Sequence, residues 1–421
     1  MASVPFSSPL AAELSEGVLE RFLRYVRVDT QAEEGAPAST FPSTAKQLDL
    51  SRILADELRA IGLDDVELNE FGYVIATLPG TQGAPVIGLI AHVDTTPESP
   101  GTGVSPIVHE DYAGEPIVLP GDPSQILDPA DEPALAARVG HDIVTSDGTT
   151  LLGADDKAGV AEIMTAVAYL RGTSESRATV RVGFTVDEEV GRGADHFDVE
   201  AFGAEAAYTL DGSGVGEVEI ETFSARQLKV RIEGRGEHPG TAKGKLVNAV
   251  KLAADLVAGL PRDTLSPETT EGREGFVHPS RIVATVEEAV VTIIVRDHDD
   301  EEFERHTELV LQLAREIQER EPRARVSVET WDQYHNMRSV IEQHPRIVAN
   351  AEEAIRRAGV EPVRSIIRGG TDGARLTAMG LPTPNLFTGG QKYHSRREWA
   401  SVQDMATAAA MVVELVRVWG E

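Results

Sequence analysis

A short apolar stretch that ends in two polar residues, VIGLIAHVD at residues 86–94, decides the predicted fold. Its first part, Val86 to Ala91, is an apolar run of strand length. Side chains alternate along a strand, so His92 and Asp94 are expected to project from the same side at its carboxyl end. Ligands bind at the carboxyl ends of strands in α/β sheets. Taken alone, His-x-Asp is a common pattern and favours a hydrogen-bonded loop histidine over a metal ligand.

Predicted strands and helices alternate around this stretch. Gly62 is expected to end the first helix. Strands separated by helices predict an α/β fold in which a mixed sheet is flanked by helices. Residues 92–149 are rich in proline, glycine and aspartate, and we expect long loops there rather than a separate core. The predicted elements are strands at residues 73–76, 180–186 and 206–210 and helices at residues 50–61 and 157–170.

A second unit is predicted from Gln227 onward. Its first helix is expected to present one apolar line, and its second begins in the acidic run Asp297–Glu302, which suits a helix N-terminus. The order of elements, β-α-β-β-α-β, is that of a ferredoxin-like module. The predicted strands are at residues 228–232, 282–286, 290–295 and 325–330, the second helix is at 299–318, and the apolar line of the first helix is Val247, Val250, Ala254 and Val257.

Helical patterns return behind this module, at residues 345–358 and 402–418. The module is therefore predicted to interrupt a larger domain that resumes after it. We expect the first part of the larger domain at residues 1–223, the inserted domain at 224–330 and the second part at 331–421.

Composition excludes several classes of function. The 421 residues include 39 Lys and Arg and 69 Asp and Glu, a formal charge of −30, so nucleic acids and anionic membranes are poor partners. The chain has no cysteine, so a metal site must use His, Asp and Glu. Residues 1–20 contain no Lys or Arg and no long apolar run. A soluble, cytoplasmic protein without signal peptide or membrane anchor is therefore expected.

Acidic residues mark three further places. The sequence LGADDKAG at residues 152–159 puts two acids between a glycine turn and a helix start, where an N-cap alone would explain them. The sequence TVDEEVG at residues 185–191 puts three carboxylates at the end of an apolar strand, where they repel one another unless cations are present. Asp211 precedes Gly212 after the next strand, and taken alone it fits an ordinary turn.

Together these residues are more specific than any one of them. We expect four strand ends to deliver His92, Asp155, Glu188 with Glu189, and Asp211 to one rim of the sheet. His394, in a polar loop, can supply a second imidazole. Two histidines and three carboxylates without thiolate form the ligand set of a hydrolytic zinc, cobalt or manganese pair. Glu188 is then surplus to coordination and available as a base for metal-activated water.

These motifs resemble those of the di-zinc exopeptidases related to glutamate carboxypeptidase, and within that family the tripeptide aminopeptidases. The resemblance covers nearly the whole chain, including both predicted domains. It departs at residues 39–43 and 222–224, which match less closely. The segments that carry it, besides residues 92–95, 152–159, 187–191 and 210–212, are His238–Gly244, Thr270–Phe276, Val295–Asp299 and Arg368–Gly373.

The resemblance implies a role for each site residue. Asp155 would bridge two metals, and a cis peptide bond would follow it. Asp94 would orient His92, and Glu188 would be the general acid and base. His238 would stabilise the oxyanion in the neighbouring subunit, although taken alone it fits a turn before a helix. The remaining ligands would be His92 and Asp211 for one metal and Glu189 and His394 for the other.

The resemblance also implies an activity. The protein would bind two Zn²⁺ per chain, with Co²⁺ or Mn²⁺ as substitutes, and hydrolyse the N-terminal peptide bond of tripeptides. Arg296, Arg368 and Asn248 would bind the small peptide substrate, and the inserted domain would act as a lid and form a homodimer. A related di-zinc dipeptidase, carboxypeptidase or N-acyl amino acid deacylase is the alternative. A non-catalytic protein that binds cations or a solute is a more distant one.

Overall fold

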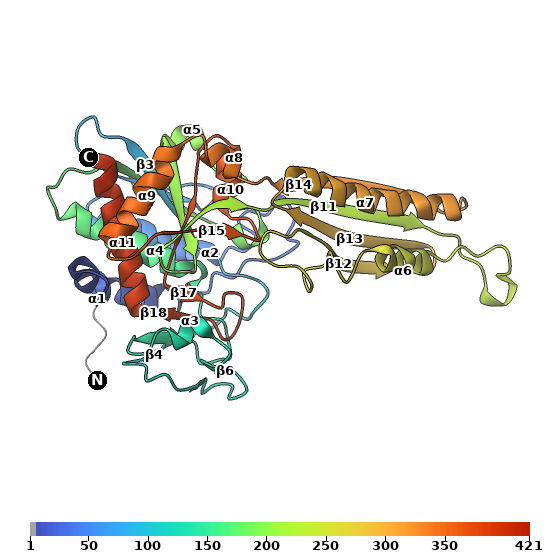
Figure 1. Cartoon of the computed structure of the whole chain (residues 1–421), viewed down its shortest axis with the longest axis horizontal. Coiled ribbons are helices and arrows are strands. Elements are labelled where there is room, and N and C mark those ends of the chain that lie inside the picture. The colour runs from blue at the N-terminus through green and yellow to red at the C-terminus, as the bar shows by residue number, and fades with distance from the viewer. Residues whose placement is uncertain (1–5) are drawn as a thin grey trace. The chain divides into compact units, whose positions relative to one another are not determined.

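Strand β3 (Val86–His92) lies inside an eight-stranded sheet of the computed structural model, which describes residues 6–421 (Figure 1). It pairs in parallel with β8 (Thr179–Thr185) on one side and β9 (Ala206–Gly212) on the other. The outer pairs β1–β2, β2–β8 and β10–β16 are antiparallel, so the predicted mixed sheet is confirmed. The other strands are β1 (Glu67–Leu68), β2 (Val74–Leu78), β16 (Asn385–Phe387), β10 (Glu217–Thr222) and β15 (Val363–Ile367).

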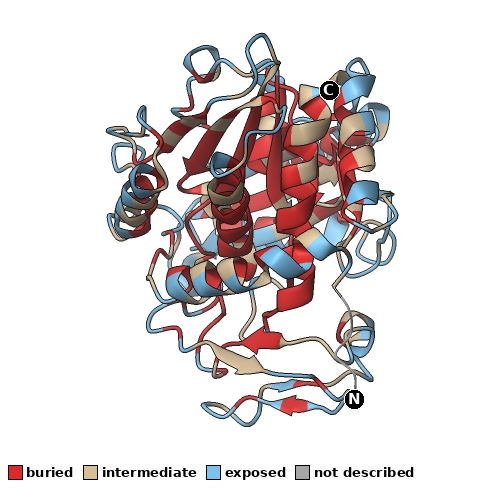
Figure 2. Cartoon of the chain, turned by 90° about the vertical axis from the view of Figure 1, so that its left-hand side faces the viewer, coloured by how far each residue is buried: buried red, intermediate tan, exposed pale blue. Residues whose placement is uncertain are grey.

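Two helices that are buried along most of their length hold this sheet. Helix α4 (Ala154–Arg171) packs on β3 and β9, and α11 (Val402–Gly420) packs on α4. Figure 2 shows these buried residues in red beneath a more exposed outer layer. Helix α1 (Pro9–Tyr25), which the sequence did not predict, contacts both, and α9 (Pro345–Arg357) contacts α11. None of the helices within residues 6–421 is long and apolar enough to cross a membrane.

The shorter helices follow the same local rules. Helix α2 (Gln47–Ile61) ends at Gly62, whose φ of 98° suits glycine, as predicted. Helix α10 (Asp372–Ala378) begins at Thr371, whose hydroxyl accepts a hydrogen bond from the Gly373 N–H. The other short helices are α3 (Pro133–Ala136), α5 (Val199–Phe202) and α8 (Arg338–Ile341).

Residues 92–149 are not the coreless loops that the sequence predicted. They contribute β4 (Ile107–His109) and β7 (Ile143–Thr145) to a four-stranded sheet that β17 (Gly390–Gln391) and β18 (Trp399–Ser401) complete. Strands β5 (Ile117–Val118) and β6 (Ile126–Leu127) form a separate pair. The strands are too short to leave a periodic pattern, and the central Trp399 comes from a distant part of the chain. The small core consists of Tyr112, Ile117, Leu119, Leu127, Leu135, Ile143 and Trp399.

The inserted module has the predicted β-α-β-β-α-β order and forms a unit of residues 221–338 and 366–370. Its sheet is antiparallel in the order β12-β13-β11-β14. The expected end at residue 330 is wrong, because β14 continues to Tyr334, and the segment with Arg368 belongs to this unit. The elements are β11 (Ser224–Glu233), α6 (Ala249–Gly259), β12 (Phe276–Ala284), β13 (Glu288–Asp297), α7 (Asp300–Arg320) and β14 (Arg325–Tyr334).

The predicted apolar line of α6 is wrong for two of its four residues, whereas Val247 and Val257 lie in or against the core of the unit. Val250 and Ala254 are exposed, and Val247 precedes the helix. The Asn248 side chain caps the helix by accepting hydrogen bonds from the Val250 and Lys251 N–H groups, so the helical repeat starts at Ala249. The residues that face the core are Ala249, Leu252, Ala253 and Leu256.

Candidate metal centre

Three neighbouring strands bring acidic and imidazole side chains to one edge of the large sheet. His92 ends β3, Asp211 lies near the end of β9, and Glu188 and Glu189 form a short turn, η1 (Glu188–Val190), just after β8. Because these strands are parallel, their carboxyl ends meet at the same edge. The expectation of a fourth strand end was wrong for Asp155, which lies at the start of α4.

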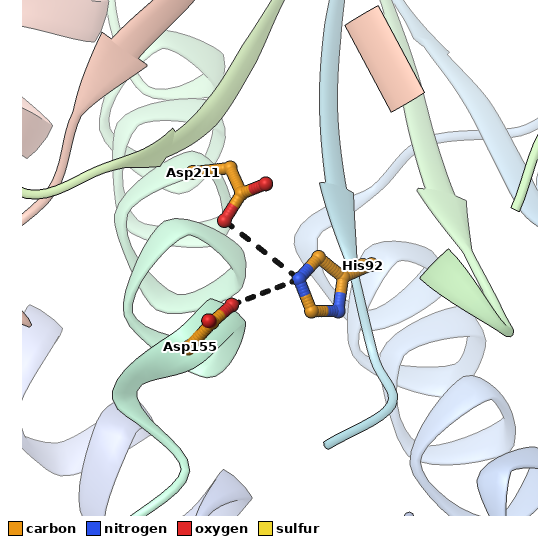
Figure 3. Close-up of side chains that lie close together, drawn as sticks. All are labelled: His92, Asp155 and Asp211. Carbon is orange, nitrogen blue, oxygen red and sulfur yellow. Dashed lines mark hydrogen bonds and ion pairs between the residues drawn. The ribbon is translucent and has the colours of Figure 1, made fainter. Parts of the chain in front are cut away.

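The ligand atoms form two groups that share Asp155. In the first, His92 Nε2 lies 3.0 Å from Asp155 Oδ1 and 3.7 Å from Asp211 Oδ1 (Figure 3). In the second, His394 Nε2 lies 3.2 Å from Asp155 Oδ2 and 2.8 Å from Glu189 Oε2. Each group of three ligand atoms fits within 4.8 Å, close enough to contact one ion. The two oxygens of Asp155 therefore face different imidazoles.

The backbone around Asp155 explains how the carboxylate reaches this position. Gly153 has a φ of 85°, which turns the chain into α4, and Asp155 and Asp156 have non-helical backbone angles. The peptide bond between the two aspartates is cis. Asp156 points elsewhere: its Oδ2 accepts a hydrogen bond from the His92 N–H at 3.1 Å. Only Asp155 of this acidic pair joins the cluster.

Asp94 connects the two halves of the cluster. Its carboxylate is fully buried and accepts hydrogen bonds from the N–H groups of Glu188, at 3.1 Å, and Glu189, at 3.2 Å. His92 Nδ1 lies 3.1 Å from the carbonyl oxygen of Asp94 and 3.3 Å from its carboxylate. A proton on Nδ1 would leave Nε2 free to bind a metal. Asp94 is thus positioned to orient both His92 and the Glu188–Glu189 turn.

Asp187, the first of the three consecutive acids, points away from the cluster. Its carboxylate accepts hydrogen bonds from the backbone and hydroxyl of Ser43 and from the side-chain amide of Gln47. Arg192 also approaches it, at 3.9 Å. Its φ of 59° places the next two residues on the opposite side. The repulsion expected among three acids is therefore relieved by separating one of them.

The imidazoles and carboxylates of the cluster shift one another's pKa values. Burial opposes protonation of His92 and His394, but the neighbouring carboxylates raise the pKa of His92 well above its ordinary value and that of His394 to about 12. Burial, together with the charge of Asp155, raises the pKa of Glu189 to about 8 and that of Asp211 to about 6. Protons on these side chains reduce the repulsion among the carboxylates. A bound divalent cation would reduce the same repulsion.

The donor set fits a pair of hydrolytic metals. Two imidazoles and three carboxylates are ligands of Zn²⁺, Co²⁺ and Mn²⁺. Glu189 Oε1 is buried and has no hydrogen-bond partner within residues 6–421, as expected of an atom that an ion would contact. Each group could therefore supply ligands to one ion, with Asp155 common to both groups.

Glu188 is the acid that neither group uses. Its carboxylate has no hydrogen-bond partner among the described residues, and Glu188 lies next to His92, Asp211 and Asp372. Burial raises the pKa of Glu188 well above its ordinary value, and Asp211 and Asp372 add to the shift. Asp372 is held by the Thr185 hydroxyl at 2.7 Å. A carboxylate of raised pKa next to the cluster can accept and return a proton.

The other predicted site residues lie in the inserted unit. The Arg296 side chain has no ion pair within residues 6–421, and its Nε is buried without a partner. The adjacent Asp297 faces His306 instead, at 3.3 Å. Arg368 donates to the Gly272 carbonyl at 3.0 Å and to the Thr270 hydroxyl at 2.9 Å.

Two predicted residues of this unit have local roles. Asn248 caps α6, and the exposed His238 accepts a hydrogen bond from the Gly240 N–H at the turn η2 (Pro239–Thr241). The turn is the alternative that the sequence offered for His238.

The structure also places a residue at the cluster that the sequence did not indicate. Glu98 Oε2 lies 3.3 Å from His394 Nδ1, the ring nitrogen opposite the one that faces Asp155. Glu98 follows Asp94 by four residues in a proline-containing loop. No periodicity or spacing links it to His394, which lies nearly three hundred residues later, so only the folded chain reveals the pair.

Comparison with known proteins places these features in context. Residues 146–418 match the sequence profile of the peptidase family M20/M25/M40. Peptidase T of Geobacillus thermodenitrificans is 47% identical over 409 residues, which cover 96% of this chain and 99% of the relative. The crystal structure of aminopeptidase PepT from Bacillus cereus superposes with a TM-score of 0.73 at 24% identity, covering 97% and 99% of the two chains. That of a tripeptidase from Staphylococcus aureus gives 0.76 at 23%, covering 96% and 98%.

Proposed function

The chain belongs to the peptidase family M20/M25/M40, and on that basis we propose that it is an aminopeptidase that hydrolyses the N-terminal peptide bond of tripeptides. The single observation that carries this proposal is the pair of ligand groups that share Asp155, with the uncommitted Glu188 beside them. The peptidase T relative, at 47% identity over 96% of the chain, supports the choice of substrate class.

The proposed cofactor is a pair of Zn²⁺ ions, for which Co²⁺ or Mn²⁺ could substitute. Asp155 would contact both ions, His92 and Asp211 would complete one site, and Glu189 and His394 would complete the other. Divalent ions in such a site supply Lewis acidity and lower the pKa of bound water.

The protein's own groups would move the proton and place the reactants. Glu188 would take the proton from the attacking water and return it to the leaving amine. Asp94 would hold His92 and the Glu188–Glu189 turn in their positions through the hydrogen bonds described above. Acidic walls around the cluster favour the protonated N-terminus of a peptide.

Recognition of the other end of the substrate is proposed for Arg296, with Arg368 as a second cation. A guanidinium that lacks a carboxylate partner in the free protein is available to bind one. The ring of Phe276 lies under both guanidinium groups, at 5.9 Å from Arg296 and 5.8 Å from Arg368, which limits their mobility. Asn248 would contribute its amide N–H groups, since its oxygen is occupied by the α6 cap.

We further propose a homodimer formed through the inserted unit. Strand β12 pairs only with β13 among the described strands and is therefore an edge strand. Its Ile282 and Val283 are 50% and 55% exposed. An exposed apolar edge strand favours pairing with a second chain. His238 would then serve the active site of the partner. A cytoplasmic location stays a prediction, which cell fractionation would test.

The experiment is hydrolysis of a matched peptide series, Ala₂, Ala₃ and Ala₄, by the protein supplied with ZnCl₂, CoCl₂ or MnCl₂, with products identified by mass spectrometry. We expect Ala₃ to be cleaved fastest, to alanine and Ala₂, and chelation to abolish the reaction. A second series, Leu-Ala-Ala and Ala-Ala-Leu, shows which end is released. Preference for Ala₂, release of the C-terminal residue, or cleavage of N-acetyl-alanine alone would assign the related activities instead. Metal binding without hydrolysis would indicate a binding protein.

A further inference from the structure

A buried carboxylate outside the ligand set links the two segments that carry Asp155 and His394. Glu398 lies four residues after His394 and is 1% exposed. Its Oε2 accepts hydrogen bonds from the N–H groups of Leu152, at 2.8 Å, and Gly153, at 2.7 Å. Its Oε1 accepts one from the Asp155 N–H at 2.9 Å. Both carboxylate oxygens thus accept hydrogen bonds from the backbone that leads into Asp155.

These three N–H groups have no local acceptor. Gly153, the N-cap of α4, has no side chain, so the usual cap from within the helix is missing. Asp155 has non-helical backbone angles, so the local helical geometry does not set the direction of its carboxylate. Glu398 supplies the missing acceptors from a distant part of the chain. These hydrogen bonds hold the backbone of Asp155 in place.

The same residue fixes the loop of His394. Its N–H donates to the Ser395 carbonyl at 3.2 Å, and the Ser395 hydroxyl donates to the Lys392 carbonyl at 2.7 Å. Lys392 and His394 both have positive φ, 57° and 60°, which side chains other than glycine adopt only when their surroundings hold them. Immediately after Glu398, β18 begins and pairs with β7.

We propose that Glu398 is a positioning residue that sets the distance and orientation of Asp155 relative to His394, and thereby the affinity of the metal pair. The proposal rests on the proposed function for its metals. The carboxyl group matters because both of its oxygens accept hydrogen bonds, from three N–H donors in all. A glutamine there would keep the shape of the side chain but turn an NH₂ group toward at least one backbone N–H, leaving that donor without an acceptor.

The test compares Glu398→Gln with wild type and with Glu57→Gln. Glu57 is a matched control because its carboxylate is also largely buried and accepts hydrogen bonds from Arg21 Nε at 2.8 Å and Tyr25 Oη at 2.6 Å, yet it contacts no member of the cluster. Metal-free proteins are titrated with ZnCl₂ against a competing chelator and with CoCl₂ by visible absorption. Thermal unfolding is recorded with and without ZnCl₂.

In Glu398→Gln we expect the affinity of at least one Zn²⁺ to fall by about 10–100-fold, the range seen when a hydrogen-bond partner behind a metal ligand is lost. The Co²⁺ absorption bands should also change, and the rise in Tm on adding Zn²⁺ should shrink. In Glu57→Gln, whatever its metal-free Tm, the Zn²⁺ affinity, the Co²⁺ bands and the Zn²⁺-dependent rise in Tm should match wild type. A lower metal-free Tm in Glu398→Gln with an unchanged rise and unchanged affinity would reduce Glu398 to a structural role and overturn the proposal.

If Glu398→Gln does not fold, Glu398→Asp provides the same test. It keeps the charge but shortens the side chain by one methylene, so it should fold and bind Zn²⁺ more weakly than wild type does. Wild-type affinity in that variant would overturn the proposal equally. These outcomes are separate from the proposed function, since a wild-type protein that binds two metals but cleaves no peptide would leave the Glu398 result intact.

Discussion

Glu188 and Glu189 are adjacent on one short turn but have different surroundings, and this difference indicates a different role for each. Glu189 contacts His394, whereas the Glu188 carboxylate has no hydrogen-bond partner among the described residues. Glu188→Gln should therefore keep two metals per chain, since no ligand is removed, while the loss of the proton acceptor should lower kcat by about 10²–10⁴-fold. Elemental analysis and peptide hydrolysis measure the two effects. Glu189→Gln is the control and should lose metal. Loss of both metals in Glu188→Gln would assign it to coordination instead.

Arg296 is proposed to bind the C-terminal carboxylate of the substrate, and this contact would set the preferred peptide length. A charge-assisted contact with the C-terminal carboxylate is worth about 1.5–3 kcal/mol, or about 10–150-fold. C-terminal amidation of Ala₃ should lower kcat/KM by this order in wild type and much less in Arg296→Ala. The control is Arg281→Ala, which removes an exposed arginine from the neighbouring strand β12. If amidation costs the same in Arg296→Ala as in wild type, Arg296 does not bind the carboxylate, and Arg368 becomes the candidate.

Some residues of the cluster can be predicted from the sequence, and others cannot. His92, Glu188 and Asp211 lie at the ends of apolar strands. The rule that ligands bind at the carboxyl ends of strands therefore predicts them. Asp155 follows no such strand, so the reason for including it was wrong, and His394 is one histidine in a polar loop that the chemistry of the ligand set added. Glu98 and Glu398 carry no signal, because each acts through a partner that is distant along the chain and becomes adjacent only on folding.

At the level of elements, the pairing of β10 with β16 buries the acidic side chain of Glu219. The free energy of unfolding should therefore depend on pH. Glu219 lies opposite Asn385, is 9% exposed and accepts a hydrogen bond from the Asn385 amide. Burial raises its pKa from 4.5 to about 8, so between these values folding takes up a proton that the unfolded chain does not hold. The free energy of unfolding should therefore fall as pH rises through this window, by up to about 1.4 kcal/mol per pH unit.

Glu219→Gln isolates this contribution. Guanidinium unfolding of both metal-free proteins at pH 5, 6, 7 and 8 should give a shallower decline in the variant, whose amide does not titrate. The difference between the two profiles reports Glu219 together with its electrostatic coupling to Glu217 and Asp211. Parallel profiles for wild type and Glu219→Gln would show that Glu219 is ionised in the folded protein throughout this range.

Long elements were predicted best. Helices α2 and α7 and strand β11 have a clear apolar period, whereas α11 is buried on nearly every side and β3 is a continuous apolar run, and the positions of all five agree with the sequence. Strands of two or three residues, such as β5 and β17, are too short to show any period. For α6 the helix was right and its buried face was wrong, because the choice of Val250 over Leu252 depended on which residue begins the helix.

At the scale of the whole molecule, the sequence predicted two units but misplaced one boundary, since strand length is set by pairing with β11 rather than by composition. The segment of residues 366–370 joins the inserted unit although it is far from it along the chain. Arg368 therefore shares a unit with Arg296, and its guanidinium packs over the rings of Phe223 and Phe276. Two cations on one unit could bind a substrate carboxylate together.

The proposed homodimer gives the prediction that tests the molecule as an assembly. If His238 serves the partner's active site, mixing inactive Glu188→Gln with inactive His238→Ala and refolding them together should restore activity, because each hybrid contains one site with both groups. Random pairing makes half of the dimers hybrid with one working site each, so about a quarter of wild-type activity is expected. Glu188→Gln mixed with Asp155→Ala is the control and should stay inactive, since Glu188 and Asp155 serve the active site of their own chain and each site of the hybrid therefore keeps one defect. Hybrid formation is verified with differently tagged chains, and verified hybrids without activity would show that His238 acts within its own chain or has no role in the reaction.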